Sequence, residues 1–372
     1  MERFSLSDIS KKNCADVYRL VYQTKRVSKQ QIATALQMSL PTVTQHLSTL
    51  LESGLVRKQG QISSGIGRKA AAFSPCLSAR VSIGVEILPA EVLILLVNLD
   101  GTALFTQKIP LSFTEGSAYW DALGEAVMGA RRSSGIPEEN VLGVGVAIQG
   151  LVSKDGRRVT YGEILQCTGL TIEALEKVLP FLCRFFHDTE CAAELEIWLR
   201  PELTDAIYLF LGHHLGGAVI LDRRIYSGRT GRSGNLEHIT LIEGGRPCYC
   251  GRKGCLDAYC SADALLAGDT PEVFFTALRQ GEPDYRGRWT EFLGWLAHSL
   301  NDLHMLMDCP IVLGGYLAPY LTEEDLDRLF SLIQFRTAFK EDENFLRIGV
   351  QEDNVVAAGA ALPYIRDYLD AL

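Results

Sequence analysis

Apolar residues recur at helical spacing in three segments near the start of the chain. Residues 13–24 carry apolar side chains at 14, 17, 18, 20, 21 and 22, a spacing that predicts a helix facing a core. A second helix is predicted to begin after Ser28, because Ser28 is a favoured N-cap residue and Gln31 completes a capping box. A third is predicted over 40–53, with Gly54 as its stop signal. Its apolar stripe comprises Val43, Leu47, Leu50 and Leu51.

The third predicted helix also has a polar face, formed by Thr42, Thr44, Gln45, His46 and Ser48. Threonine, glutamine and histidine side chains can reach base edges or phosphates in a DNA groove. Two strand-like runs separated by a Gly/Ser turn follow over 55–74. A short helix, a tight turn, a polar-faced helix and a hairpin together indicate a winged helix-turn-helix that binds DNA. The residues predicted to contact DNA are Thr42, Thr44, Gln45, His46, Arg68 and Lys69.

The charge distribution supports this interpretation. Residues 1–75 contain 11 Lys and Arg against 4 Asp and Glu, a net charge of +7, whereas the whole chain carries −9. Residues 76–372 therefore carry −16. A basic module on an acidic body indicates that contact with nucleic acid is confined to the first module. The alternative interpretation of residues 1–75 is a three-helix protein–protein module with a solvated polar face.

Beyond residue 80, strand-like and helical patterns alternate. Strands are predicted over 81–87, 91–98 and 103–109, then a helix over 117–132 and a strand over 141–148. The later predicted elements are a strand over 185–188, a helix over 189–199, strands over 206–211 and 218–222, helices over about 261–280 and 285–307, a strand over 309–315 and a final helix over 352–369. Strands that alternate with helices imply a layered α/β fold.

Composition and cysteine usage indicate the compartment. With 372 residues, 47% hydrophobic and 22% charged, the chain is typical of a globular protein with two or three domains. The first residues lack the apolar core of a signal peptide, and no run of 18 uncharged apolar residues is present. Most of the ten cysteines are scattered singly, as in a reducing compartment. We therefore expect a cytoplasmic protein with no membrane partner.

One loop departs from this scatter, because it gathers one histidine and three cysteines. The residues are His238, Cys248, Cys250 and Cys255, within 18 residues of one another. Four nitrogen and sulfur ligands are the set that a closed, tetrahedral structural zinc site needs. Glycines at 251 and 254 allow the chain to fold tightly around an ion. We predict zinc as a cofactor here, and the alternative is four unrelated residues in a Cys-rich loop.

The same loop resembles the zinc motif of the ROK family (repressor, open reading frame, kinase). That motif reads G-x-x-G-E-x-G-H, then about ten residues, then C-x-C-G-x-x-G-C-x-E. The matching residues here are Gly231, Gly234, His238, Cys248, Cys250, Gly251, Gly254 and Cys255. The chain departs from the motif at Asn235, at Glu237 and at Asp257, which replace Glu, Gly and Glu. Residues 28–75 also resemble the winged helix of ROK repressors, of the xylose and N-acetylglucosamine repressor type.

The resemblance covers about residues 13–365 and implies the fold class. We expect an α/β protein with an N-terminal winged helix-turn-helix over 1–75, followed by a two-lobed body that is actin/hexokinase-like (ribonuclease-H-like). Lobe 1 is expected over 76–188. Lobe 2, with the zinc loop, is expected over 189–372, and the C-terminal helix is expected to pack back on lobe 1.

Two of the three turns that hold phosphate in ROK kinases are altered. In the first, Glu86 stands where phosphate charge would lie, the glycine pair is missing and Pro89 removes an amide donor. In the second, His213 and His214 replace small and hydroxyl-bearing residues, and we expect one imidazole to be buried and the other to face a cleft. The third, at Gly314, is retained. Phosphoryl transfer depends on positioned and neutralised phosphate, so we predict that the protein is not an enzyme.

The resemblance also implies a sugar site. Asp188 occupies the position of the kinase general base, and in a repressor it would accept a hydrogen bond from a sugar hydroxyl. The alternative role for Asp188 is that of a helix N-cap. His238 can bind zinc through one ring nitrogen and donate to a sugar from the other. The expected ligand-binding residues are His187, Asp188, Asn235, His238 and Asp257.

Taken together, these patterns predict a sugar-responsive transcriptional regulator, a repressor that binds operator DNA and a small carbohydrate-type ligand. We expect a homodimer or homotetramer, because symmetric dimers reading two half-sites are the usual geometry of such domains. One alternative is a sugar kinase with a DNA-binding appendage. The other is a repressor whose ligand site has decayed and which a protein partner controls.

Overall fold

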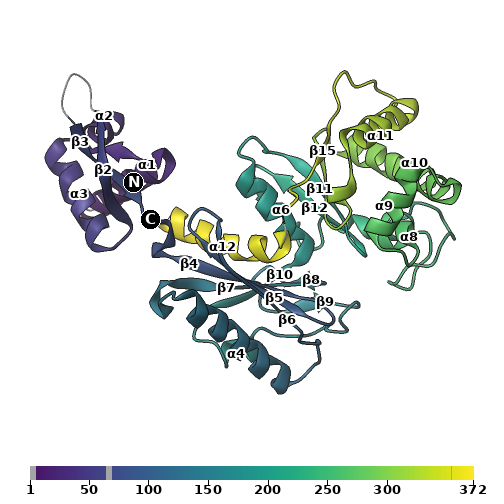
Figure 1. Ribbon diagram of the computed structural model, residues 1–372, viewed down its shortest axis with the longest axis horizontal. Helices are drawn as coiled ribbons and strands as arrows, with labels where there is room; N and C mark the ends of the chain where they lie inside the picture. Colours follow the sequence, from purple (N-terminus) through teal and green to yellow (C-terminus); the bar gives the residue numbers. More distant parts are fainter. Residues whose placement is uncertain (1–5, 64–68, 353) are drawn as a thin grey trace.

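The computed structural model describes residues 6–63, 69–352 and 354–372, which form an N-terminal module and a two-lobed body (Figure 1). The N-terminal module combines three helices with a sheet of strand order β1-β3-β2. Ser28 and Gln31 form the predicted capping box, and Ser39 caps the third helix. The first helix begins before the predicted residue 13. The elements are α1 (Leu6–Thr24), β1 (Val27–Ser28), α2 (Lys29–Ala35), α3 (Leu40–Glu52), β2 (Val56–Ser63) and β3 (Lys69–Pro75).

Lobe 1 is built on a five-stranded sheet of order β10-β7-β4-β5-β6. Strands β4, β5 and β6 are antiparallel, whereas β7 and β10 run parallel to β4. Helix α4 covers one face of this sheet and the C-terminal helix α12 covers the other (Figure 1). The elements are β4 (Val81–Ile87), β5 (Val92–Asn98), β6 (Ala103–Ile109), α4 (Ser117–Ser134), β7 (Val141–Ile148), β8 (Leu151–Val152), β9 (Val159–Tyr161), α5 (Glu173–Glu176) and β10 (Cys183–His187).

Lobe 2 repeats the same sheet topology, with strand order β13-β12-β11-β14-β15. Strands β11, β12 and β13 are antiparallel, and β14 and β15 run parallel to β11. The two lobes therefore share one topology, although their sequences do not match residue by residue. The elements are α6 (Asp188–Leu199), β11 (Ala206–Leu211), β12 (Leu215–Leu221), β13 (Arg224–Ile225), α7 (Asp257–Cys260), α8 (Ala262–Leu266), α9 (Pro271–Gln280), α10 (Pro283–Leu306), β14 (Ile311–Gly314), α11 (Glu323–Arg336) and β15 (Leu346–Ile348).

The C-terminal helix α12 (Val355–Ala371) packs against lobe 1 and α6 at unusually short backbone distances. A Cβ atom added at Gly84 or Gly145 of lobe 1 would lie 1.8 or 1.9 Å from a carbonyl oxygen of α12. One added at Gly359 would lie 1.7 Å from the carbonyl oxygen of Cys191 in α6. Glycine is therefore required at these positions, because any side chain would force the elements apart.

The N-terminal module shares an apolar core with lobe 1 and α12. Tyr18 of α1, Leu95 of β5 and Ile365 of α12 belong to one buried cluster. The hydroxyl of Tyr22 donates a hydrogen bond of 2.7 Å to the carbonyl oxygen of Leu99. Figure 1 shows the C-terminal end of α12 beside this module. The module is therefore packed onto the body, and α12 is the element that contacts both.

The structure differs from the predicted pattern in both lobes. The helix predicted over 261–280 is two helices, because Ala267 and Gly268 adopt positive φ angles of 49° and 98° and Pro271 begins a new helix. Strands β8, β9 and β15 were not predicted, since runs of two or three residues give no detectable period. Within the described residues, we find no helix with the length and apolarity needed to cross a bilayer.

Candidate ligand cleft, metal centre and DNA-binding face

Four potential metal ligands lie together in one loop of lobe 2. Ligand atoms of His238, Cys248, Cys250 and Cys255 all lie within 4.8 Å of one another. The sulfurs of Cys250 and Cys255 are 3.8 Å apart, and the sulfur of Cys248 is 3.8 Å from Nδ1 of His238. A tetrahedral zinc ion with Zn–S distances of about 2.3 Å places neighbouring sulfurs about 3.8 Å apart. The four side chains therefore fit a single tetrahedral metal ion.

The backbone of this loop sets the spacing of the ligands. Gly251 and Gly254 have φ angles of 83° and 85°, which favour glycine. A Cβ atom at Gly254 would lie 1.7 Å from the carbonyl oxygen of Ile242, so no larger residue fits there. A β-bridge between Thr240 and Cys255 holds the two ends of the loop together. The ligand arrangement thus follows from local turns, as the sequence spacing predicts.

His238 lies between the metal ligands and the space in front of the loop. Its Nδ1 is the ring atom close to Cys248, whereas its Nε2 lies 3.9 Å from Oε1 of Glu237. Its ring centroid is 5.2 Å from that of Tyr249. If a metal occupies Nδ1, Nε2 carries the ring proton and can donate a hydrogen bond to a bound molecule.

A cleft of about 820 Å³ opens between the lobes, within the size range of small-molecule sites. Its walls come from the end of β4, the start of α6, the β11–β12 turn, the turn at Leu236–His238 and the start of α12. The predicted ligand-binding residues that line it are His187, Asp188, Asn235 and His238. Aromatic faces are added by Tyr161, Phe210, Tyr249 and Tyr316.

Asp257 is not among the cleft-lining residues in the described part of the chain, so a ligand contact by this residue stays a prediction. Asp257 is 5% exposed and begins α7 behind the β11–β12 turn. Its Oδ1 accepts a hydrogen bond of 2.8 Å from the backbone N–H of Leu215 and lies 3.6 Å from Nδ1 of His214. The nearby carboxylate of Asp257 is the main cause that raises the pKa of His214. Asp257 therefore holds the turn that carries His214 in place.

Three carboxylates from separate elements face the cleft. Oδ1 of Asp188 accepts a hydrogen bond of 2.7 Å from the backbone N–H of Thr189 and lies 3.3 Å from Nε2 of His187. Burial raises the pKa of Glu86 to about 7, and the charge of Asp188 acts in the same direction. Burial also raises the pKa of Glu237 to about 7, with Asp188 again contributing. Asp188 is thus close enough to both glutamates to disfavour their ionisation.

Glu237 is a buried cleft residue that the sequence pattern alone does not identify. It is 5% exposed and lines the cleft, and its Oε2 has no hydrogen-bond partner among the described residues. The ROK zinc motif has glycine at this position, so the motif does not predict a ligand-binding side chain there. The available signal is its position immediately before His238, because a metal ligand in a tight turn also fixes the direction of its neighbour.

The altered phosphate turns present side chains to the cleft, and Glu86 and His213 both line it. Nδ1 of His213 lies 2.8 Å from Oδ1 of Asp263, and its ring stacks on Tyr316 with centroids 4.8 Å apart. Its side chain is 66% exposed, and His214 is half-buried in the cleft wall. The expectation that one imidazole is buried is therefore wrong, because the β11–β12 turn projects into the opening of the cleft.

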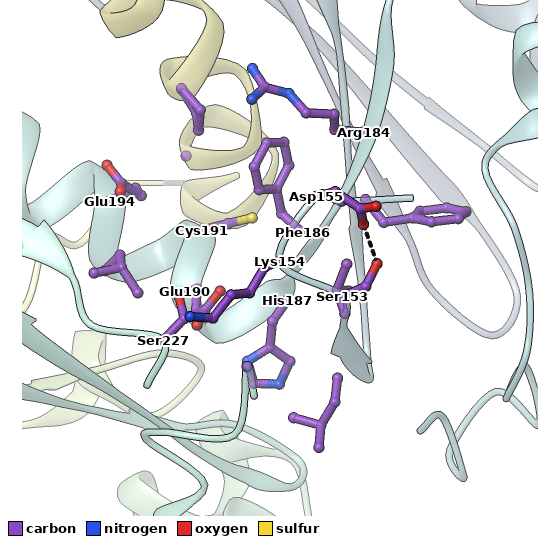
Figure 2. A pocket seen from close by; sticks show the side chains of 18 of the residues that line it. Ser153, Lys154, Asp155, Arg184, Phe186, His187, Glu190, Cys191, Glu194 and Ser227 are labelled. Atoms are coloured by element: carbon purple, nitrogen blue, oxygen red, sulfur yellow. Dashed lines mark hydrogen bonds between the residues drawn. The ribbon is translucent and has the colours of Figure 1, made fainter. Parts of the chain in front are cut away.

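A second cavity of about 270 Å³ adjoins the cleft at the junction of β10 and α6 (Figure 2). Ser153 and Asp155, joined by a hydrogen bond of 2.6 Å, lie on one side of it, and Glu194 of α6 lies on the other. His187 lines both this cavity and the cleft. Arg366 of α12 makes a bidentate ion pair with Glu194, so this region links α6 to the C-terminal helix.

The predicted DNA-contacting residues differ in exposure. On α3, Thr44 and Gln45 are exposed and Thr42 is half-buried. Lys29 of α2 donates a hydrogen bond of 3.1 Å to Oγ1 of Thr44, which brings a positive charge to the same face. Lys69 is exposed at the start of β3. Arg68 lies outside the described residues.

His46 does not belong to this exposed face, and the structure corrects that prediction. Its side chain is 5% exposed, on the side of α3 that carries Val43, Leu47 and Leu50. Residue 46 follows Val43 by three positions and precedes Leu50 by four, which is the spacing of one helix face. The chemical type of the side chain suggested a DNA contact, but its helical phase places it in the core.

Two family models match this chain. One described as "ROK family" matches residues 82–362, which include most of both lobes and the first half of α12. The other, described as "Bacterial regulatory protein, arsR family", matches residues 28–58, which include α2 and α3. The two matches therefore correspond to the body and to the helix-turn-helix.

Curated relatives and solved structures give the same division. The chain is 29% identical over 257 residues to the DNA-binding transcriptional dual regulator NagC of Escherichia coli K12, a match that spans 68% of this chain and only 63% of NagC. It is 22% identical over 384 residues to the xylose repressor of Caldicellulosiruptor bescii, spanning 95% of each. The crystal structure of a ROK family transcriptional regulator, a homolog of the E. coli MLC protein, matches with a TM-score of 0.75 at 19% identity, over 97% of this chain and 96% of that one. This likeness confirms the predicted fold.

Proposed function

The chain belongs to the ROK family, and from that premise we propose that it is a sugar-responsive transcriptional repressor that binds operator DNA. The proposal rests on one observation. The same chain has an exposed polar face on α3 and a cleft of the size that binds small molecules. The names of the relatives NagC and xylose repressor support the extension to this chain. We also propose that it acts as a homodimer, since symmetric half-sites suit such modules.

DNA binding in this proposal falls to the N-terminal module. Thr44 and Gln45 on the exposed face of α3 read base edges, while Lys69 and Arg68 of the wing and Lys29 of α2 contact phosphates. The net charge of +7 over residues 1–75 supports this division, because neutralising phosphates is the sequence-independent part of DNA affinity.

We propose that the four-ligand cluster holds zinc, with His238, Cys248, Cys250 and Cys255 as ligands. The distances within the cluster fit this ion. A structural zinc ion supplies no chemistry to a ligand directly, and its role is to fix the loop that carries Glu237 and His238. Nε2 of His238 then donates to a ligand hydroxyl from a fixed position.

The cleft is proposed to bind without turning over its ligand. Glu86 lines the cleft at the end of β4, and its carboxylate opposes a bound phosphate whenever it is ionised. The exposed imidazole of His213 stands in the turn where ROK kinases carry small and hydroxyl-bearing residues. Asp188 is retained and can still accept a hydrogen bond from a sugar hydroxyl.

Helix α12 offers a route by which the cleft affects the DNA-binding module. Val355 and Val356, at its start, line the cleft. Arg366 pairs with Glu194 of α6, and Ile365 packs in the core that α12 shares with α1. A ligand that binds two arrangements of the lobes unequally would shift α12, and through it the module.

The test of the proposed function is operator binding with and without sugars. Fragments of the source genome that the full-length protein retains should share an inverted repeat, and one or more monosaccharides should change the affinity for it at least about fivefold. A coupled assay for ADP release with the same sugars and ATP should give no turnover. Phosphorylated sugar in that assay, or no specific DNA, would refute the proposal.

A further inference from the structure

The cleft presents hydrogen-bond acceptors that lack donors. Oε2 of Glu237 and Oε1 of Gln149 are buried atoms of cleft-lining residues, and neither has a hydrogen-bond partner within residues 6–63, 69–352 and 354–372. Glu237 is 95% buried, since its exposed fraction is 5%. A buried carboxylate oxygen without a donor is unfavourable, and a ligand that brings a donor would remove that cost. The site is therefore built for a donor-rich ligand.

The charge of the cleft also favours a ligand that brings hydrogen-bond donors. Six carboxylates line it, from Glu86, Glu91, Glu163, Asp188, Glu237 and Glu352. Among the described residues, Arg232 is the one arginine or lysine in the lining, and it is exposed. Lys108 pairs with Glu91 at 2.6 Å, and among the residues that the structure describes no lysine or arginine forms an ion pair with the other five carboxylates. A concave surface with this excess of negative charge attracts cations and repels phosphate and carboxylate groups.

Two of these carboxylates line the cleft from separate elements. Asp188 lies at the start of α6, and Glu237 lies in the turn before the metal loop. Nearby groups suit sugar hydroxyls, because His187, Asn235 and His238 all present polar atoms to the cleft. Tyr249, with its ring centroid 4.3 Å from that of His214, offers an aromatic face to an apolar sugar surface or a cation.

We propose that the cleft binds an amino sugar with a free, protonated amine, held by the carboxylates of Glu237 and Asp188. An ammonium group has three donors and no acceptor, and so complements a wall of acceptors. A neutral sugar would supply donors without charge, and a sugar phosphate would meet repulsion from Asp188. This inference rests on the proposed function, because it specifies the chemical class of the ligand at the same cleft.

Isothermal titration of the zinc-loaded, full-length protein tests this inference. The probes are D-glucosamine, D-galactosamine and D-mannosamine, each compared with its parent hexose, its N-acetyl form and its 6-phosphate. At least one free amino sugar should bind about tenfold more tightly than its neutral counterparts, the size expected for a hydrogen bond to a charged group. Its 6-phosphate should bind more weakly than the unphosphorylated amine.

Glu237→Gln then keeps the shape of the side chain and removes its charge. The preference for the amine over the parent hexose should fall about tenfold, while affinity for the hexose stays within about threefold. Glu202→Gln is the matched control, because Glu202 is exposed and is not among the described residues that line the cleft. Circular dichroism and zinc content are measured for each variant. Where Glu237→Gln loses zinc or fold, Asp188→Asn, which changes the other proposed carboxylate, replaces it in the same titrations.

The outcomes separate this inference from the proposed function. A hexose or N-acetyl sugar that binds as tightly as the amine, and that changes operator affinity, would overturn the inference and leave the repressor proposal standing. An amine preference that Glu237→Gln and Asp188→Asn do not alter would also overturn it. Failure of the proposed function would be seen differently, as operator binding that none of these sugars affects.

Discussion

The metal loop and the cleft in front of it are adjacent, yet the sequence determines them in different ways. All four proposed metal ligands lie within residues 238–255, and the turns of that loop set their spacing. The cleft carboxylates Glu86, Asp188 and Glu237 come from three elements that meet only when the lobes pack together. A site made by one loop can be recognised from spacing. A site assembled across lobes depends on side-chain directions that spacing does not encode.

Removing one metal ligand should have the largest effect, because the loop is proposed to be complete by itself. In Cys250→Ser only three of the proposed ligands remain, so zinc should fall from about one equivalent to less than half. Structural zinc contributes on the order of 10 kcal/mol to the folding of small zinc domains, so the loop should lose its order. Metal analysis and thermal unfolding measure both effects.

Cys76→Ser is the control for this substitution, because Cys76 is half-buried and lies outside the metal loop. It should keep a full equivalent of zinc and a similar unfolding midpoint. Full zinc occupancy in Cys250→Ser would remove Cys250 from the site and with it the claim that this loop forms the site without help from the rest of the chain.

The same contrast explains which predictions from the sequence are correct. The capping box at Ser28 and the strands β4 to β7 of lobe 1 follow from local spacing, and the structure confirms them. His46 and Asp257 are predicted to contact DNA and ligand because of their chemical type. The helical phase of His46 buries its side chain, and Asp257 accepts a hydrogen bond from the backbone at the β11–β12 turn. Helix α11 is absent from the predicted elements, although Leu326, Leu329 and Ile333 mark its buried face at helical spacing. That helix could therefore have been predicted, whereas the directions of the cleft side chains could not.

The buried cleft carboxylates should make the free energy of unfolding depend on pH, whereas the metal loop should affect folding through its bound ion. The pKa of Glu86 is about 7, above its ordinary value of 4.5. The folded protein therefore keeps a proton that the unfolded chain has lost, and the free energy of unfolding should fall as pH rises from about 5 to about 7. The shift corresponds to about 3 kcal/mol at most. Glu86→Gln should remove this part of the pH dependence, as measured by urea unfolding at several pH values.

Glu163→Gln serves as the control for Glu86→Gln, since it removes an exposed carboxylate from the same cleft. Its pH profile should match that of the wild type. If the profile of Glu86→Gln also matched the wild type, Glu86 would be ionised throughout, and the cleft would be more hydrated than its burial indicates.

The next largest effect is expected on DNA binding, which the proposal assigns to the basic N-terminal module and not to the acidic body. Replacing Arg68 and Lys69 with alanine should weaken binding to all DNA sequences and lower the salt slope by about one unit for each phosphate that is no longer neutralised. Gln45→Ala should instead change sequence preference, at a cost of about 1–3 kcal/mol for the preferred base. Lys177→Ala, an exposed change on the body, should alter neither quantity. Anisotropy titrations at several salt concentrations distinguish these outcomes.

The smallest expected effect is that of Asp188→Asn on DNA binding without ligand. Asn keeps the oxygen that accepts the backbone N–H of Thr189, so the start of α6 should persist. Because Asp188 lies in the cleft and α3 lies in a separate module, the affinity for operator DNA should stay within about twofold. The response to ligand should disappear, since the carboxylate proposed to hold the ligand is gone. Loss of DNA binding itself would mean that Asp188 mainly supports the fold, and a retained response would place the ligand elsewhere in the body.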